Sequence, residues 1–192
     1  MKKCIVTGGA GFLGSHICNF FSKKNFKVYC LDNNEKAFKN LKNKNKIVKV
    51  KIDISNKQQV KEFFSSLKLA KIDLLINNAA IDAVPFFSKN ISGNNLNTEN
   101  WIKEFKVAIV GSNLMINMFK NKMAKYKSGS IINIGSDLSV ISPNQSIYKS
   151  HFGNYNKPAS YSVMKHGLLG LTKYYATLFA KNGIKVNMVS PA

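Results

Sequence analysis

Arginine is absent from this chain, and acidic residues are few. The 29 basic residues are all lysines and stand against only 9 aspartates and glutamates, so the formal net charge is +20. Such a charge is compatible with a nucleic-acid or anionic-membrane partner. Specific nucleic-acid sites, however, prefer arginine for bidentate contacts with bases and phosphates. The lysines are also spread among Asn, Ile and Phe, which share A/T-rich codons, so we expect a codon-biased surface with no specific nucleic acid and no membrane as partner.

Cysteines and long apolar runs are also scarce. Cys4, Cys18 and Cys30 form no CxxC pair and no ligand-like cluster, so the sequence indicates neither a disulfide framework nor a metal site. A sparse, odd number of cysteines suits a reducing compartment, and we expect a cytoplasmic protein. The first apolar run stops at Thr7, and no run approaches the ~20 residues that span a bilayer. We therefore expect neither a secretion leader nor a membrane anchor.

Short apolar runs alternate with helical patterns along the whole chain. Strands are predicted near residues 5–6, 27–31, 47–52, 72–76, 130–134 and 184–189, and the main helices over 11–24, 98–125 and 158–182, with another helix capped by Ser55. This alternation predicts an α/β fold: a Rossmann-type doubly wound parallel sheet in three α/β/α layers, with the order 3-2-1-4-5-6. We expect one NAD(P)-binding domain over residues 1–192, with the ligand crevice at the carboxyl ends of the strands. Residues 80–97 and 137–157 are predicted to be long non-helical stretches that carry function.

A glycine-rich turn joins the first strand to the first helix. Gly8, Gly11 and Gly14 are spaced three apart, with Phe12 and Leu13 between the last two. Glycine permits a tight turn and a close approach of backbone to a pyrophosphate, which the amino terminus of the helix then faces. A glycine-rich turn without a ligand is the alternative, but its place between a strand and a helix favours a dinucleotide site.

An aspartate ends the second predicted strand. Asp32 can accept hydrogen bonds from the ribose hydroxyls of a dinucleotide and would repel a 2′-phosphate. It therefore favours NAD over NADP as the cofactor, although Lys36 and Lys39 nearby argue in the other direction. The alternative is an aspartate that only shapes the turn before Asn33.

Tyr161 and Lys165 are four residues apart on the last predicted helix and so share one face. An unperturbed tyrosine has a pKa near ~10, and a nearby ammonium lowers it by stabilising the phenolate. Such a tyrosine can exchange a proton with a carbonyl or alcohol oxygen while a hydride moves. The YxxxK pattern alone often occurs by chance. Here it follows the fifth predicted strand in a chain that also has the glycine turn, and this combination favours a catalytic pair.

Together these motifs resemble the short-chain dehydrogenase/reductase family over essentially the whole chain. The resemblance rests on the glycine turn, Asp53-Ile54, Asn77-Asn78-Ala79, Ser136, Tyr161/Lys165 and Asn187 to Pro191. It implies that Tyr161 is the acid/base, that Lys165 lowers its pKa and holds the nicotinamide ribose, and that Ser136 binds the substrate oxygen, with Ser139 as a substitute. It further implies that Asp53 and Ile54 lie by the adenine, that Asn78 and Ala79 line the cofactor, and that Asn77 braces the central strands. The segments 136–145 and 157–174 also resemble members that accompany bacterial surface-polysaccharide and sugar-modification genes.

The sequence departs from the family in several places. Ala108 stands where the family has an Asn of the proton relay, and Asn113 is not in the equivalent helical phase. The stretch between Ser136 and Tyr161 is longer than in classical members and holds Tyr148, Lys149, His151 and Tyr155. The chain also stops where the family continues into a substrate loop, a helix and a last strand, so we expect a sheet without that strand. The glycine spacing resembles the extended, sugar-nucleotide branch more than the classical one.

The resemblance implies an oxidoreductase that transfers hydride between NAD(H) and a secondary alcohol or ketone. The small-molecule substrate is then a sugar or sugar phosphate of surface-glycan biosynthesis, and the full-length enzyme is a homo-oligomer. Three alternatives remain open at this point: a nucleotide-sugar epimerase or dehydratase of the extended type, a truncated and inactive nucleotide-binding chain, and a nucleic-acid-binding protein.

Overall fold

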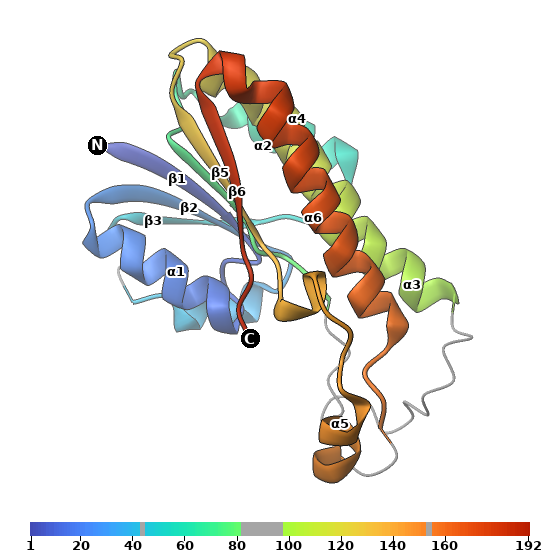
Figure 1. The fold of residues 1–192 in the computed structure, drawn as a ribbon. Helices are drawn as coiled ribbons and strands as arrows, with labels where there is room; N and C mark the ends of the chain where they lie inside the picture. The colour runs from blue at the N-terminus through green and yellow to red at the C-terminus, as the bar shows by residue number, and fades with distance from the viewer. Residues whose placement is uncertain (43–44, 82–97, 153–154) are drawn as a thin grey trace.

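One parallel sheet organises the molecule. The computed structural model describes residues 1–42, 45–81, 98–152 and 155–192. Six strands pair in the order β3-β2-β1-β4-β5-β6 (Figure 1). They are β1 (Lys2–Thr7), β2 (Phe26–Asp32), β3 (Ile47–Lys51), β4 (Leu74–Asn77), β5 (Gly129–Ile134) and β6 (Ile184–Val189). The predicted doubly wound order is confirmed, and the strand order reverses between β1 and β4, where such sheets place their ligand crevice.

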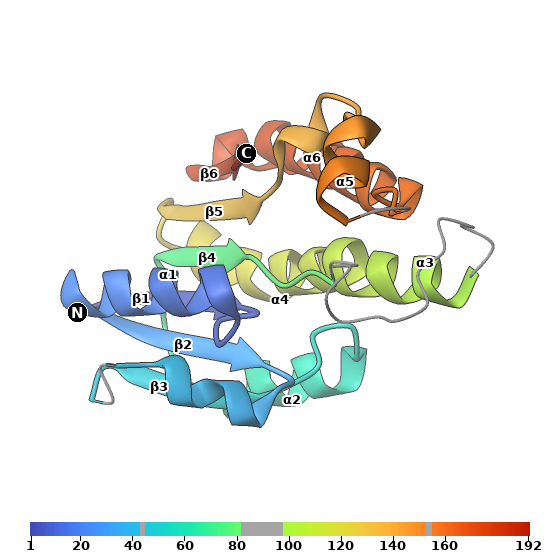
Figure 2. The same ribbon diagram turned by 90° about the horizontal axis from the view of Figure 1, so that it is seen from below.

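Helices cover both faces of the sheet. Helix α1 (Phe12–Lys23) and a 3₁₀ helix (Glu35–Asn40) pack on one face, while α2 (Lys57–Ser66), α4 (Ser112–Ala124) and α6 (Ala159–Phe179) pack on the other (Figures 1 and 2). A further short helix, α5 (Gln145–Phe152), projects beyond the carboxyl ends of the strands. Within the described ranges, no helix combines the length and the apolarity that a bilayer crossing requires.

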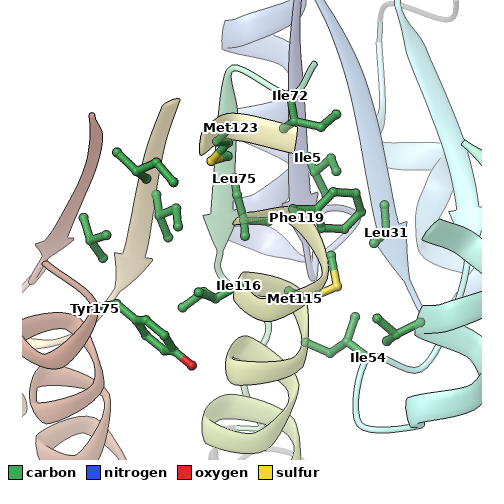
Figure 3. Close-up of a cluster of buried hydrophobic side chains, with 14 of the residues drawn as sticks. Ile5, Leu31, Ile54, Ile72, Leu75, Met115, Ile116, Phe119, Met123 and Tyr175 are labelled. Carbon is green, nitrogen blue, oxygen red and sulfur yellow. The ribbon is translucent and has the colours of Figure 1, made fainter. Parts of the chain in front are cut away.

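The larger apolar core lies between the sheet and helices α2, α4 and α6. Phe119 of α4 is fully buried and packs among side chains from the strands, such as Ile5 and Leu75 (Figure 3). Burial on both sides explains why the central strands read as continuous apolar runs rather than as alternating patterns. This core fixes α4 and α6 against the carboxyl half of the sheet, where the candidate site lies.

The three cysteines belong to the smaller core on the other face. Cys4, Cys18 and Cys30 are fully buried free thiols. Hydrogen bonding with Cys30 and burial raise the pKa of Cys18 far above its usual range, and burial does the same for Cys4. The three thiols therefore serve as small apolar side chains of this core.

The long helix predicted over 98–125 is divided by a π-helical segment. Helix α3 (Thr98–Phe105) leads into a π helix over Lys106–Gly111, and α4 follows directly. Gly111 allows this segment to approach the β3–α2 connection, because a Cβ there would lie 2.8 Å from Ile54 Cδ1. π segments inside helices frequently occur at functional sites.

Two local predictions were wrong. Helix α2 is capped by Asn56, whose Oδ1 accepts from the N–H groups of Gln58 and Gln59, whereas the Ser55 hydroxyl donates to Asp53. The stretch 137–157 is not free of helix, because it contains a 3₁₀ turn at Asp137–Ser139 and α5. Most of the other predicted loop, residues 82–97, lies outside the described residues.

Candidate active site

A cleft of about 630 Å³ opens at the carboxyl ends of the strands. It is lined by every residue that the sequence predicted for the cofactor and for catalysis: Gly8, Gly11, Phe12, Leu13, Gly14, Asp32, Asp53, Ile54, Asn78, Ala79, Ser136, Tyr161 and Lys165. The structure therefore brings together, in one place, residues from both halves of the sheet.

The glycine turn is closely packed. Gly8 has a φ of +60°, a conformation that side chains disfavour, and a Cβ there would lie 2.8 Å from Ala79 Cα. A Cβ on Gly14 would lie 2.0 Å from the Gly8 carbonyl oxygen. The N-cap of α1, Gly11, makes no side-chain capping bond, and the first turn holds no acidic residue. The amino terminus of α1 thus presents backbone N–H groups and a positive dipole end to the cleft.

Thr7 and Asn78 hold this turn against β4. The Thr7 hydroxyl accepts from the backbone N–H groups of Asn78 and Ala79 at 3.0 and 3.1 Å. The Asn78 side-chain amide donates to the carbonyls of Thr7 and Gly8 at 3.1 and 3.0 Å. Asn78 therefore does more than form a β-turn: it joins the glycine turn to the neighbouring strand end.

The two acidic residues of the cleft are partly engaged in local structure. Asp32 Oδ2 accepts from the Ala10 N–H at 3.0 Å and Oδ1 from the Asn34 N–H at 2.9 Å. Asp53 Oδ1 accepts both the N–H and the hydroxyl of Ser55. Asp32 thus shapes its turn through these two bonds, as the alternative interpretation held, and it also lines the cleft.

Tyr161 and Lys165 lie on successive turns at the start of α6. The Lys165 ammonium is buried, donates to the Ile134 carbonyl at 2.8 Å and lies 5.6 Å from the centre of the Tyr161 ring. The carbonyl bond ties α6 to the end of β5 and fixes the ammonium beside the tyrosine. An ammonium at this distance favours the phenolate.

A second ammonium, which the sequence analysis missed, lies closer to the same ring. Lys157 Nζ is 3.9 Å from the centre of the Tyr161 ring, and the residue is only 9% exposed. Its peptide group is paired with the Gln145 side chain, which accepts from the Lys157 N–H at 2.9 Å and donates to its carbonyl at 3.1 Å. No sequence signal distinguishes Lys157 from the many other lysines, because its position depends on this contact with α5.

Ser136 begins the turn that follows β5. Its hydroxyl donates to Asp137 Oδ1 at 2.7 Å and accepts from the Leu138 N–H at 3.2 Å. Ser139 is fully buried, and its hydroxyl accepts from the Ser136 N–H at 3.0 Å. Of the two serines, Ser136 alone lines the cleft, so Ser139 does not suit the role of a substitute and instead shapes the turn.

A row of buried, hydrogen-bonded polar side chains lies in the interior behind the site. Asn77 Nδ2 donates to Asn133 Oδ1, and Asn133 Nδ2 donates to the Thr172 hydroxyl, both at 2.8 Å. The chain connects β4, β5 and α6 in the interior, where an unpaired amide would be costly. The expectation that Asn77 braces the central strands thus fits its position.

The position at which the family has its relay asparagine is Ala108, and it lies in the π segment. Ala108 is buried within it and brings no polar side chain, while the neighbouring Val107 lines the cleft. Asn113 is used elsewhere, because it accepts from the Tyr175 hydroxyl at 2.5 Å between α4 and α6. The cleft is also lined by residues that the sequence analysis did not assign to the site: Leu31, Asn33, Ile52, Ala80, Ile81, Val107, Ile134, Gly135, Pro191 and Ala192. All of them except Val107 lie at the carboxyl end of a strand or within a few residues after it, which is the signal that could have identified them.

The Rossmann-type sheet, with its glycine turn and a tyrosine–lysine pair in one cleft, defines the class of nucleotide-binding α/β oxidoreductases. A family model described as short chain dehydrogenase matches residues 2–192. The chain therefore belongs to the short chain dehydrogenase family, and the family resemblance of the sequence is confirmed.

Individual relatives agree with this assignment. The chain is 30% identical over 194 residues to the short chain dehydrogenase/reductase dpfgG of Gibberella zeae, covering 97% of this chain and 67% of that protein. It is 27% identical to the NAD-dependent glycerol dehydrogenase of Listeria innocua, covering 99% of this chain and 69% of that one. A solved short chain dehydrogenase from Leptospira borgpetersenii with bound NAD+ superimposes with a TM-score of 0.80 at 28% identity, covering 99% of this chain and 70% of that one.

Proposed function

We propose that this chain transfers hydride between NAD(H) and a secondary alcohol or ketone. The observation that carries the proposal is the shared cleft, in which Tyr161, Lys165 and Ser136 face the same space as the glycine turn. The direct test is NADH formation by the purified chain with a panel of polyols, sugars and sugar phosphates. Absence of turnover with every member, under conditions where NAD+ binds, would count against the proposal.

The residues of the cleft fit a dinucleotide. The uncapped amino terminus of α1 suits a pyrophosphate. Gly14 allows this helix start to pack closely against the turn, because a Cβ there would lie 2.0 Å from the Gly8 carbonyl oxygen. Asp32 lines the cleft and would accept hydrogen bonds from the hydroxyls of the adenosine ribose, and Ile54 would supply an apolar wall for the adenine. The bound nicotinamide would supply the hydride acceptor or donor of the reaction.

The chain's own residues manage the proton. In alcohol oxidation, the Tyr161 phenolate takes the hydroxyl proton while the carbinol carbon loses its hydride and becomes a carbonyl. The Lys165 ammonium stabilises the phenolate before this transfer. The Ser136 hydroxyl turns from Asp137 to hydrogen-bond the substrate oxygen, and the carboxylate beside it remains as acceptor for the N–H of Leu138.

Asp32 makes the cofactor preference testable. We expect NADH to bind at least about tenfold more tightly than NADPH, because the 2′-phosphate would meet a carboxylate. Fluorescence titration with both cofactors measures the ratio. Asp32→Asn retains a side-chain oxygen to accept from Ala10 or Asn34 and should bring the two affinities together. Equal binding of both cofactors by the unsubstituted chain would remove Asp32 from cofactor selection.

The substrate side of the proposal names a sugar or sugar phosphate. Two features support it: the segments 136–145 and 157–174 resemble members associated with sugar modification, and one relative is a glycerol dehydrogenase, which acts on a polyol. The glycine spacing favours one further candidate, a nucleotide-sugar epimerase or dehydratase that holds NAD tightly. Cofactor that remains bound through purification would distinguish that candidate from a dehydrogenase that exchanges NAD(H).

We also propose that the chain self-associates through α6. Val163, Tyr174 and Leu178 are at least half exposed and follow one another along one face of this helix. Light scattering should therefore give a dimer or a higher oligomer, and Leu178→Lys should shift it towards the monomer. A chain that is monomeric at high concentration would contradict this.

A further inference from the structure

Tyr161 has two ammonium groups beside it rather than one. Lys165, four residues along α6, lies 5.6 Å from the ring centre, and Lys157, before the helix begins, lies at 3.9 Å. The first belongs to the YxxxK pattern, whereas the second does not. A cation over the face of an aromatic ring is attracted by its quadrupole, and more so when the ring carries the charge of a phenolate.

The position of Lys157 is determined by its surroundings. The Gln145 side chain holds the peptide of Lys157 through two hydrogen bonds, and Gln145 is the first residue of α5. Pro158 follows directly as the N-cap of α6 with a φ of −61°, which its ring requires, and Tyr161 N–H donates to the Pro158 carbonyl at 3.2 Å. The inserted stretch between Ser136 and Tyr161 thus has a structural consequence, since it supplies the helix that places this lysine.

Other charged groups lie on the elements around Tyr161. Glu104 is buried on α3, Asp137 bonds to Ser136 after β5, and Lys149 is exposed on α5. Within the described part of the chain, the two charged groups with a defined contact to the tyrosine ring are the ammoniums of Lys157 and Lys165. Both favour the charged form of the phenol, so their effects add.

We propose that Lys157 is a positioning residue whose charge, placed by Gln145, stabilises the phenolate form of Tyr161. This inference rests on the proposed function insofar as Tyr161 is the acid/base of the reaction. Lys157 acts through the tyrosine and needs no contact with the substrate. Losing an opposite charge at 4–6 Å typically moves a pKa by one unit or more, so removing Lys157 should raise the pKa of Tyr161 by about one unit.

Ultraviolet titration of the phenol tests the proposal without turnover. The absorbance change of the whole chain, minus that of Tyr161→Phe, isolates the ionisation of Tyr161. In Lys157→Met, which keeps a long apolar side chain but loses the charge, this transition should move to higher pH by about one unit. Lys157→Arg keeps the charge, so its Tyr161 transition should lie at the same pH as in the unsubstituted chain.

Two further variants separate charge from placement. Lys173→Met removes an exposed lysine of α6, the helix that carries Tyr161, and should leave the Tyr161 transition unchanged. Gln145→Leu keeps the lysine but removes both bonds to its peptide, so it should give a smaller shift in the same direction. A transition that is the same in Lys157→Met and in the unsubstituted chain would overturn the proposal, because a lysine that only packs against the ring would not change its ionisation.

Activity measurements distinguish this proposal from the function on which it rests. In alcohol oxidation, the acidic limb of the kcat/KM profile should shift upward in Lys157→Met, and the rate near neutral pH should fall about tenfold for a shift of about one unit. If Tyr161→Phe remained active while the ultraviolet shift was present, the proposed function would fail and the role of Lys157 at Tyr161 would stand. If Tyr161→Phe were inactive and the ultraviolet shift were absent, the proposed function would stand and the role of Lys157 would fail.

Discussion

Replacement of Tyr161 by Phe is expected to lower turnover by about 10²- to 10⁴-fold, the usual contribution of general acid–base catalysis. The substitution removes one hydroxyl and keeps the ring, so the packing against Lys157 and Lys165 is preserved. NADH affinity should change little, because the glycine turn and Asp32 are untouched. The measurements are the initial rate of NADH formation and the fluorescence titration of NADH with the same preparation.

Tyr174→Phe provides the matched control. Tyr174 lies on the same helix and is 61% exposed, away from the cleft. Its loss of a hydroxyl should leave turnover unchanged, which excludes a general effect of removing a phenol from α6. Wild-type turnover in Tyr161→Phe would show that the tyrosine–lysine spacing is a helical accident, and the assignment of the catalytic residues would fail with it.

The part of the site that sequence reasoning predicted is the part encoded locally. The glycine turn is defined by backbone requirements within a few residues, and the i, i+4 spacing of Tyr161 and Lys165 places them on one face of any helix. The end of each parallel strand reaches the same edge of the sheet, so Asp32, Asn78 and Ser136 could be assigned to one crevice before any contact was known. Their arrangement in a single cleft follows from topology alone.

The features that the sequence did not predict depend on tertiary contacts. Helix α5 has no strong periodic pattern, and the side chain of Gln145, its first residue, bonds to the peptide group of Lys157, which lies 12 residues further along the chain. The π segment contains Gly111, which lies so close to Ile54, a residue distant in sequence, that a Cβ there would not fit. Asn56 rather than Ser55 caps α2 because Asp53 already engages the Ser55 hydroxyl. In each case a specific contact in the folded chain selects among locally equivalent choices.

The glycine turn gives the second large expected effect. In Gly14→Ala, the new Cβ would lie 2.0 Å from the Gly8 carbonyl oxygen and 2.8 Å from Gly9 Cα. Both atoms belong to the backbone, so the turn itself must open, and overpacking of this kind costs about 1–3 kcal/mol of folding stability. The opening also displaces the N–H groups at the start of α1. Losing one or two charge-assisted hydrogen bonds to a pyrophosphate, at about 1.5–3 kcal/mol each, should weaken NADH binding on the order of a hundredfold.

Two other glycines separate these consequences. A Cβ on Gly170, in the middle of α6, would meet nothing within 4 Å, so Gly170→Ala should stabilise the fold by roughly 0.5–1 kcal/mol and leave NADH affinity unchanged. A Cβ on Gly11 would lie 3.4 Å from the Gly8 oxygen, at the edge of ordinary contact, so Gly11→Ala should fold nearly as well as the unsubstituted chain. Any loss of NADH affinity in Gly11→Ala then measures how closely the cofactor approaches the backbone, because the folding stability of this variant is nearly unchanged.

Urea denaturation and NADH titration of the three variants should therefore rank Gly14→Ala as the most destabilised and the weakest binder. If Gly14→Ala bound NADH as tightly as Gly170→Ala, the pyrophosphate would not lie at this turn, and the proposed placement of the cofactor in the cleft would fail.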